Sequence, residues 1–559
     1  MHLTPIVPFA VALIALGASF PSSMARPDEG MWLFDGLPLQ VLKEKFNFEP
    51  TKDWLEHVRL GSVRFDSGGS GSFVSPNGLV MTNHHVALSS LQEVSTPETD
   101  WVEPGFSAMR HGSEVPTKGL TIRQLVEIRD ITAQVLEWKG ADKSEKGNEW
   151  RGKLDDFCKK AVEGKPGFTA DSVPLYDGNQ YRLHVYRVYD DIRFVFAPEK
   201  QIGYYGGDYD NFTFPRYCLD CTFFRIYDNG KPLDSSKFYF PFDVEGAATD
   251  ELVFVSGHPG STDRALTFAE MEFDRDVRMP NLVRAYSTFA ERVKKQMDAD
   301  PKKAFELRDQ YFGVLNALKS MEGQLAGLRT AEMLEKIKVR DQELLAKSGK
   351  PEVKAAFDQI AAEVGKLREK FSGRRLDMQA LQQSLMDLAA TTCADAKKVI
   401  NDARFAVYGA ANYPDATFTL RLAYGTVKNY VSGTTLVAPR TTFHGLYERN
   451  QGHDNKAPYD LPQRWLDAKS KLNLDTPFNF VCTADIIGGN SGSPILDRDA
   501  KVVGLVFDGN IESLPGNYWF DERVNRCVGV HTAGMIEALK VVYGEAALVA
   551  ELLGEKTGK

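Results

Sequence analysis

The chain has 559 residues, of which 43% are hydrophobic and 26% are charged, a composition typical of a folded globular protein. Its formal net charge of −9 argues against a general electrostatic affinity for nucleic acid or for an anionic membrane surface. A chain of this length corresponds to roughly three or four domain-sized units.

The first 25 residues have the pattern of a secretory signal peptide. Residues 6–20 form an uncharged apolar stretch that is too short for a comfortable membrane span. Ser23 and Ala25 are small residues at positions −3 and −1 of a cleavage site after Ala25. We therefore expect residues 1–25 to be a signal peptide and the mature chain to be periplasmic. No later stretch is long and apolar enough to predict a membrane anchor.

Residues 26–270 are rich in segments that predict short β-strands. Residues 72–74 and 79–82 are apolar runs on either side of the sequence Ser75-Pro-Asn-Gly78. Proline at the second position and glycine at the fourth suit a type I turn, so this stretch predicts a hairpin. Further β-like runs follow in residues 183–240 and 250–262.

The pattern changes to helix over residues 271–412 and returns to β-strand over residues 413–559. In the middle segment apolar residues recur at helical spacing, as in Leu315, Leu318, Met321 and Leu325. The sequence therefore predicts an α+β fold, in which a β domain made of two separated segments carries an inserted all-α domain.

Six cysteines allow up to three disulfides in an oxidising compartment, without indicating which residues pair. Cys218 and Cys221 form a CxxC pair, but no second pair accompanies them, and no HExxH sequence is present. We therefore expect no metal and no cofactor. The cysteines are Cys158, Cys218, Cys221, Cys393, Cys482 and Cys527.

The glycine-rich sequence "GGNSGSP" around Ser491 has the chemistry of a nucleophile turn. A serine becomes a strong nucleophile only beside a base, and its reaction also needs backbone N–H groups that stabilise an oxyanion. Glycines next to the serine let the backbone direct those groups to one point. Ser491 is therefore the candidate nucleophile, and the N–H groups of Gly489 and Ser491 form the candidate oxyanion hole.

The candidate base lies upstream, in "LVMTNHHVA". His85 follows an apolar strand and precedes Val-Ala, which is similar to the strand-to-histidine junction of chymotrypsin-fold peptidases. The order histidine, then serine, also agrees with that class. The acid that orients the histidine should lie between them, and Asp208, Asp210 and Asp220 in residues 204–227 all compete for this role.

Several stretches together resemble the dipeptidyl peptidases of serine peptidase family 46. The resemblance implies a chymotrypsin-like double β-barrel with an inserted helical cap, divided into residues 26–270, 271–412 and 413–559. It also implies a homodimer and oligopeptide substrates. The stretches that carry it are residues 28–38, 69–87, 206–217, 413–430, 488–494 and 507–516.

The resemblance also implies a role for individual residues. It selects Asp220 as the acid, beside His85 as the base and Ser491 as the nucleophile. The free amino terminus of the substrate would be held by three residues, which makes the enzyme release dipeptides. They are Asn211, Phe212 and Asp508.

Gly509 follows Asp508 at the position that shapes the pocket for the second substrate residue, P1, in this family. An arginine there accompanies acidic side chains, whereas Gly509 leaves room without charge and predicts a hydrophobic P1 residue. The helical segment is shorter than in typical members, so two alternatives stay open. One is an endopeptidase or aminopeptidase on the same triad, and the other is a non-catalytic peptide-binding protein.

Overall fold

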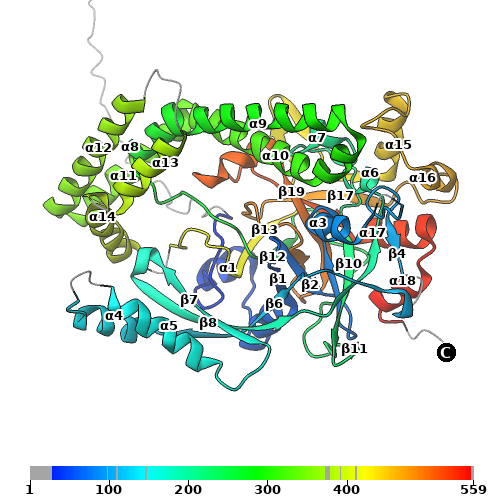
Figure 1. The fold of residues 1–559 in the computed structure, drawn as a ribbon, viewed down its shortest axis with the longest axis horizontal. Coiled ribbons are helices and arrows are strands. Elements are labelled where there is room, and N and C mark those ends of the chain that lie inside the picture. The colour runs from blue at the N-terminus through cyan, green and yellow to red at the C-terminus, as the bar shows by residue number, and fades with distance from the viewer. Residues whose placement is uncertain are drawn as a thin grey trace, which may run out of the picture.

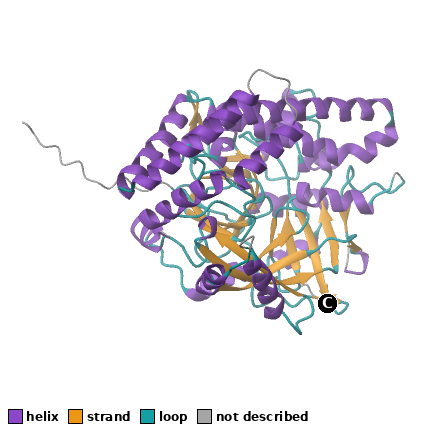
Figure 2. Cartoon of the chain, turned by 60° about the vertical axis from the view of Figure 1, so that its left-hand side comes forward, coloured by secondary structure: helices purple, strands orange, loops and turns teal. Residues whose placement is uncertain are grey.

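The computed structural model describes residues 28–555, apart from residues 97, 109–110, 145–147, 372–377, 391 and 410–411. The predicted signal peptide lies outside the described residues. The chain forms antiparallel sheets on one side of the molecule and long helices on the other (Figure 1; Figure 2). This confirms the prediction of a mixed α+β fold.

The first sheet is built from the N-terminal part of the chain, and all of its strand pairs are antiparallel. It contains the predicted hairpin, in which Ser72 lies opposite Met81. Two short strands, β11 (Lys231–Pro232) and β5 (Val115–Pro116), pair with β10 and β9 at its margin. The strand order is β4 (Phe106–Ser107), β9 (Ile192–Ala197), β10 (Thr222–Asp228), β3 (Leu79–Thr82), β2 (Ser70–Phe73), β1 (Ser62–Phe65), β6 (Ile122–Asp130), β8 (Gln180–Tyr189) and β7 (Phe168–Leu175).

The second sheet combines one strand from before the helical segment with strands from after it. A separate hairpin pairs β14 (Tyr430–Ser432) with β15 (Thr435–Val437). The strand order of the second sheet is β13 (Arg421–Thr426), β12 (Leu252–Gly257), β18 (Pro494–Leu496), β19 (Val502–Gly509), β20 (Cys527–His531), β17 (Pro477–Cys482) and β16 (Arg440–Thr442).

The long helices are inserted between two neighbouring strands of the second sheet. Strand β12 ends at Gly257, β13 begins at Arg421, and these two residues lie opposite each other. The chain therefore leaves the sheet, forms the helices and returns to the position it left. The helices are α8 (Phe268–Phe273), α9 (Met279–Ala299), α10 (Pro301–Leu328), α11 (Ala331–Ser348), α12 (Pro351–Phe371), α13 (Met378–Ala390) and α14 (Thr392–Tyr408).

Local sequence signals explain where several of these helices begin and end. Thr267 and Glu270 form a capping box at the start of α8, and the Asp300 side chain caps α10 just before a proline. Helix α11 ends at Ser348, and the next residue, Gly349, has the left-handed backbone that commonly follows a helix. Among the described residues, none of the helices is both long and apolar enough to cross a membrane.

Shorter helices cover the ends of the sheets. Two of them, α4 and α5, lie within the segment that the sequence predicted to be rich in strands. Helix α4 buries only Val135 and has almost no apolar periodicity, whereas α5 buries Leu154 and Cys158 one turn apart. These shorter helices are α1 (Leu39–Phe46), α2 (Lys52–Gly61), α3 (His84–Val94), α4 (Thr132–Ala141), α5 (Glu149–Ala161), α6 (Lys200–Gly203), α7 (Gly207–Asp210), α15 (Phe443–Gly452), α16 (Gln463–Ala468), α17 (Thr532–Glu537) and α18 (Ala546–Leu552).

A shared core joins the two sheets. One buried apolar cluster contains Leu79 and Met81 of the first sheet together with Phe254, Leu496 and Leu505 of the second. Burying this surface holds the sheets against each other and places the chain segments at their junction close together. All six cysteines are buried free thiols.

Candidate active site

His85 lies at the junction of strand β3 and helix α3. The strand ends at Thr82, the helix begins at His84, and Asn83 turns the chain between them with an extended backbone. The buried Asn83 amide donates a 2.9 Å hydrogen bond to the carbonyl of Asp220. This hydrogen bond fixes the turn before His85 against the segment that carries Asp220.

Asp220 holds His85 by two hydrogen bonds. Its Oδ2 lies 2.6 Å from His85 Nδ1, and its Oδ1 accepts the backbone N–H of His85 at 3.1 Å. Burial disfavours both charged forms, but the mutual attraction and hydrogen bonding outweigh it. The pKa of Asp220 is therefore lowered and that of His85 is raised. The neighbouring His84 is buried, which lowers its pKa to about 4 and keeps it neutral.

The turn around Ser491 has a backbone that only glycine accommodates easily. Gly489 has φ +102° and Gly492 has φ +85°. A Cβ atom on Gly492 would lie 2.0 Å from the carbonyl oxygen of Ser70, and one on Gly489 would lie 2.4 Å from that of His258. The small residues of this turn therefore let it pack directly against neighbouring backbone.

Ser70, from β2 of the first sheet, anchors this turn of the second. Its N–H donates to the Ser491 carbonyl at 2.7 Å, and its hydroxyl donates to the Gly489 carbonyl at 2.9 Å. Within the described part of the chain, the N–H groups of Gly489 and Ser491 have no hydrogen-bond partner. The turn therefore presents two unused donors while its carbonyls are engaged.

A cavity of about 120 Å³ brings most of the predicted residues together. Its lining includes His85, Asp220 and Ser491. Within the described residues the Ser491 hydroxyl forms no hydrogen bond, including to His85. Gly489 does not line the cavity, but its neighbour Gly488 does. The other predicted residues in the lining are Asn211, Phe212, Asp508 and Gly509.

Asp508 is held in place by an ion pair that the sequence did not predict. Its Oδ2 accepts hydrogen bonds from Arg216 and from the Phe212 N–H, and its Oδ1 accepts the Gly509 N–H at 2.8 Å. The side chains of Arg216 and Asp508 are only 2% and 4% exposed. Phe212 has φ +54°, an uncommon backbone conformation for a non-glycine residue that is often found at functional sites.

Helix α10 of the inserted segment also reaches the cavity. Phe312 and Asn316 line it, and the Asn211 amide donates a 3.0 Å hydrogen bond to Asn316 Oδ1. This bond leaves the carbonyl oxygen of Asn211 available to accept from a ligand. Arg216 lies in the "PR" sequence next to the predicted residues, so the motif contained a signal for it. Asn316 had no local signal, because its position depends on how α10 packs.

Metal binding has no support in the described residues. They contain no group of three or more histidine, cysteine, aspartate or glutamate side chains placed to hold a metal ion. Cys218 and Cys221, which lie on either side of Asp220, are buried free thiols, and burial raises the pKa of Cys218 to about 11. These thiols are therefore protonated at neutral pH and are poor ligands or nucleophiles in this state.

Comparison with known proteins identifies the family of the chain. The sequence model described as Peptidase S46 matches residues 27–392 and 374–554, so the match covers most of the chain. The chain belongs to the Peptidase S46 family. This confirms the predicted family and the predicted enzyme class.

Similar proteins cover nearly the whole chain at low identity. The chain is 24% identical to dipeptidyl-peptidase 7 of Phocaeicola vulgatus over 724 aligned residues, covering 97% of this chain and 99% of that protein. It is 25% identical to the Asp/Glu-specific dipeptidyl-peptidase of Porphyromonas gingivalis over 712 aligned residues, covering 95% and 97%. Both alignments are longer than this chain of 559 residues, so these relatives carry additional residues.

Solved structures share the fold. The crystal structure of Porphyromonas endodontalis DPP11 in complex with the dipeptide Arg-Glu superposes with a TM-score of 0.81 at 20% identity, covering 94% of this chain and 99% of that one. The same protein crystallised alone gives a TM-score of 0.80 at the same identity.

Proposed function

We propose that this chain is a serine exopeptidase that releases dipeptides from the free amino terminus of oligopeptides. The observation that carries the proposal is the His85–Asp220 pair, doubly hydrogen-bonded and opening into the same cavity as Ser491. The names of the similar proteins, dipeptidyl-peptidase 7 and Asp/Glu-specific dipeptidyl-peptidase, support the same reaction.

The proposed mechanism assigns one task to each member of the triad. Asp220 accepts the Nδ1–H of His85, which leaves Nε2 free to take the proton of the Ser491 hydroxyl. Ser491 then attacks the scissile carbonyl and forms an acyl-enzyme, which water hydrolyses after the shortened peptide has left. The N–H groups of Gly489 and Ser491 stabilise the oxyanion of each tetrahedral intermediate.

The arrangement of the sheets supports a chymotrypsin-like double β-barrel with a helical cap. His85 and Asp220 belong to the first sheet region, Ser491 belongs to the second, and the cavity lies where the two meet. Phe312 and Asn316 of α10 close it from the helical side. The proposed domains are residues 26–270, 271–412 and 413–559, with export to the periplasm and a homodimer as further parts of the proposal.

Release of dipeptides follows from an amine site at a fixed distance from Ser491. A protonated amino terminus needs acceptors, which the Asn211 carbonyl oxygen and the Asp508 carboxylate supply in the same cavity. Asp508 already compensates Arg216, so the substrate amine would share this carboxylate with the guanidinium. Phe212 supplies an aromatic wall beside it.

We propose a hydrophobic P1 residue. Ile486, Ile487 and Phe507 line the cavity, and Gly509 adds no charge. Arg216 also lines the cavity, but its charge is compensated by the ion pair between its Nη1 and Asp508. The Asp/Glu specificity in the name of one relative is therefore not carried over to this chain.

The test uses a fluorogenic dipeptidyl substrate with a hydrophobic second residue, its N-acetylated copy, its copy with an acidic second residue and the matching single-residue substrate. The proposal predicts turnover of the free-amine hydrophobic form alone, and its loss in Ser491→Ala. Equal cleavage of the acetylated copy would contradict amine recognition, and unchanged turnover by Ser491→Ala would contradict the nucleophile.

A further inference from the structure

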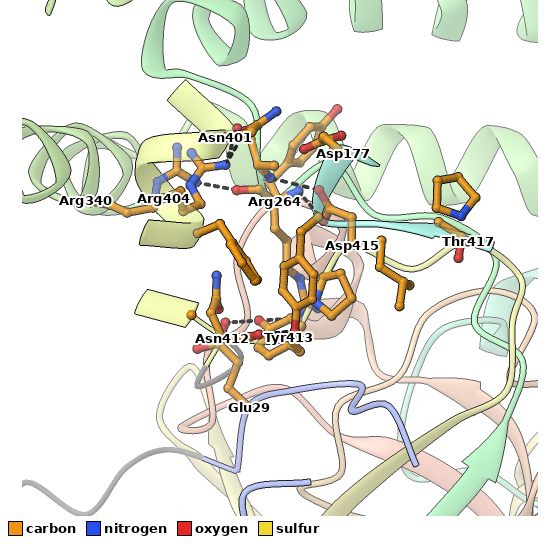
Figure 3. A pocket seen from close by; sticks show the side chains of 18 of the residues that line it. Glu29, Asp177, Arg264, Arg340, Asn401, Arg404, Asn412, Tyr413, Asp415 and Thr417 are labelled. Carbon is orange, nitrogen blue, oxygen red and sulfur yellow. Dashed lines mark hydrogen bonds between the residues drawn. The ribbon is translucent and has the colours of Figure 1, made fainter. Parts of the chain in front are cut away.

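A second cavity, of about 300 Å³, lies apart from the candidate active site (Figure 3). It is enclosed by α11 and α14 of the inserted helices, by the turn between β7 and β8, and by residues 412–417. None of its lining residues also lines the active-site cavity. Its volume is at the lower end of the range for small-molecule sites.

Two arginines form a basic wall of this cavity. Arg404 donates Nη1 to the Ala265 carbonyl at 3.1 Å and to Asn401 Oδ1 at 3.3 Å, whereas its Nη2 is buried and has no partner within the described residues. Arg340 donates to the carbonyls of Arg264 and Leu266. Burial, and then repulsion from Arg340, lowers the pKa of Arg404. A buried, unpaired guanidinium nitrogen is costly, and an anionic oxygen would satisfy it.

The lining also contains three carboxylates, Glu29, Asp177 and Asp415, of which the last two lie across from these arginines in the view of Figure 3. Asp415 is fully engaged, because it accepts hydrogen bonds from the Thr262 hydroxyl and from the N–H groups of Arg264 and Ala265. Asp177 is on the turn after β7, where its φ of +53° is unusual for a non-glycine residue. Asp177 lines the cavity from an exposed turn and is close enough to Asp415 for the two carboxylates to repel each other, so a cation beside them would be stabilising.

The arginines on one side of the cavity and the carboxylates on the other together determine which kind of ligand it can bind. A dianion such as phosphate would gain from Arg404 but would be repelled by Asp177 and Asp415. A molecule with a carboxylate at one end and an ammonium at the other would match both walls. Aromatic side chains in the lining, Tyr176, Phe405 and Trp519, offer apolar surface between them.

We propose that this cavity is a second ligand site, which binds a free amino acid or dipeptide with its carboxylate on Arg404 and its ammonium on Asp177. The site is connected to the candidate active site by one ion pair. Arg264, on the cavity wall, donates to both oxygens of Asp485 at 2.5 and 2.8 Å. Asp485 directly precedes Ile486 and Ile487, which line the active-site cavity.

The test is calorimetric titration of Ser491→Ala, which turns over no substrate under the proposed mechanism, with the dipeptide Ala-Phe. We expect two binding sites, one in each cavity, and only one in the double variant that also carries Arg404→Gln. Loss of one charge-assisted hydrogen bond corresponds to about tenfold or more in affinity at the second site. The matched control is Lys398→Gln, which removes a charge from an exposed part of the same helix and should keep both sites.

Three probes distinguish the ligand classes. The C-terminal amide of Ala-Phe should lose the Arg404-dependent site, and inorganic phosphate should not occupy it. Identical stoichiometry with and without Arg404→Gln, or Arg404-dependent binding of phosphate alone, would overturn the proposal. If Arg404→Gln does not fold, as judged by its melting temperature, Asp177→Asn should remove the same site, because Asp177 lines the cavity from an exposed turn that tolerates the change. Retention of both sites in that variant would overturn the proposal.

Discussion

Replacing Asp220 by asparagine tests the proposed triad with little change in shape. In the native pair one carboxylate oxygen accepts the backbone N–H of His85 and the other accepts from Nδ1. An asparagine keeps the first bond only if its oxygen faces that N–H. Its NH₂ group then faces Nδ1 and must donate to it, which moves the ring proton to Nε2. The imidazole can then no longer accept the serine proton.

The expected loss is large because the inverted tautomer is fixed by a second bond. Rotating the amide would restore an acceptor at Nδ1 but would place the NH₂ group against the His85 N–H, so neither orientation satisfies both contacts. Loss of this tautomer control corresponds to about a 10⁴-fold drop in kcat, or about 5 kcal/mol. The assay is kcat with the free-amine dipeptidyl substrate, together with the melting temperature. A folded variant that retains kcat within tenfold of the wild type would show that Asp220 does not control the tautomer of His85.

Four further outcomes are expected. Turnover should fall as the pH drops through the raised pKa of His85, because this histidine must be neutral to act as a base. In Asp220→Asn the fall should occur at a lower pH, and an unshifted pH–rate profile would count against the His85–Asp220 pair. Asn211→Ala should lower kcat/KM for free-amine substrates by about 10- to 100-fold, as expected for a hydrogen bond to a charged group, and equal loss for an acetylated substrate would argue against an amine site. Gly492→Ala should lower the free energy of unfolding by more than about 1 kcal/mol in denaturant titration. The residue has a positive φ, and the added Cβ would also meet the Ser70 carbonyl oxygen. An unchanged free energy of unfolding would contradict this close contact. Gly509→Arg should raise the ratio of kcat/KM for an acidic P1 residue to that for a hydrophobic one. Gly509→Ala is the control, because it adds only the Cβ, which meets the Ser513 hydroxyl. An unchanged ratio in Gly509→Arg would exclude this position from P1 selection.

The general architecture could be predicted from the sequence because each strand and helix leaves a local pattern of apolar and polar residues. Alternating strands, turn residues such as Gly78 and the 3.6-residue period of the middle segment all reflect which face of each element is buried. No local sequence pattern indicates that β12 pairs with β13 across the whole helical insertion. That contact joins residues 257 and 421, and it depends on the core formed by both sheets.

The candidate site divides in the same way. His85 and Ser491 lie in motifs whose residue types are dictated by local geometry, as the contacts of Gly489 and Gly492 illustrate. From the residues alone, Asp208, Asp210 and Asp220 could not be separated, because the choice depends on which carboxylate reaches a histidine more than 100 positions away. Asn316 was missed for the same physical reason.

The most direct test of dipeptide release by Ser491 is mass spectrometry of the products of an unmodified hexapeptide with hydrophobic residues at positions two and four. We expect sequential release of the two N-terminal dipeptides by the wild-type chain and no products from Ser491→Ala. Release of single residues, cleavage at internal bonds without an amino-terminal register, or unchanged products from Ser491→Ala would contradict it.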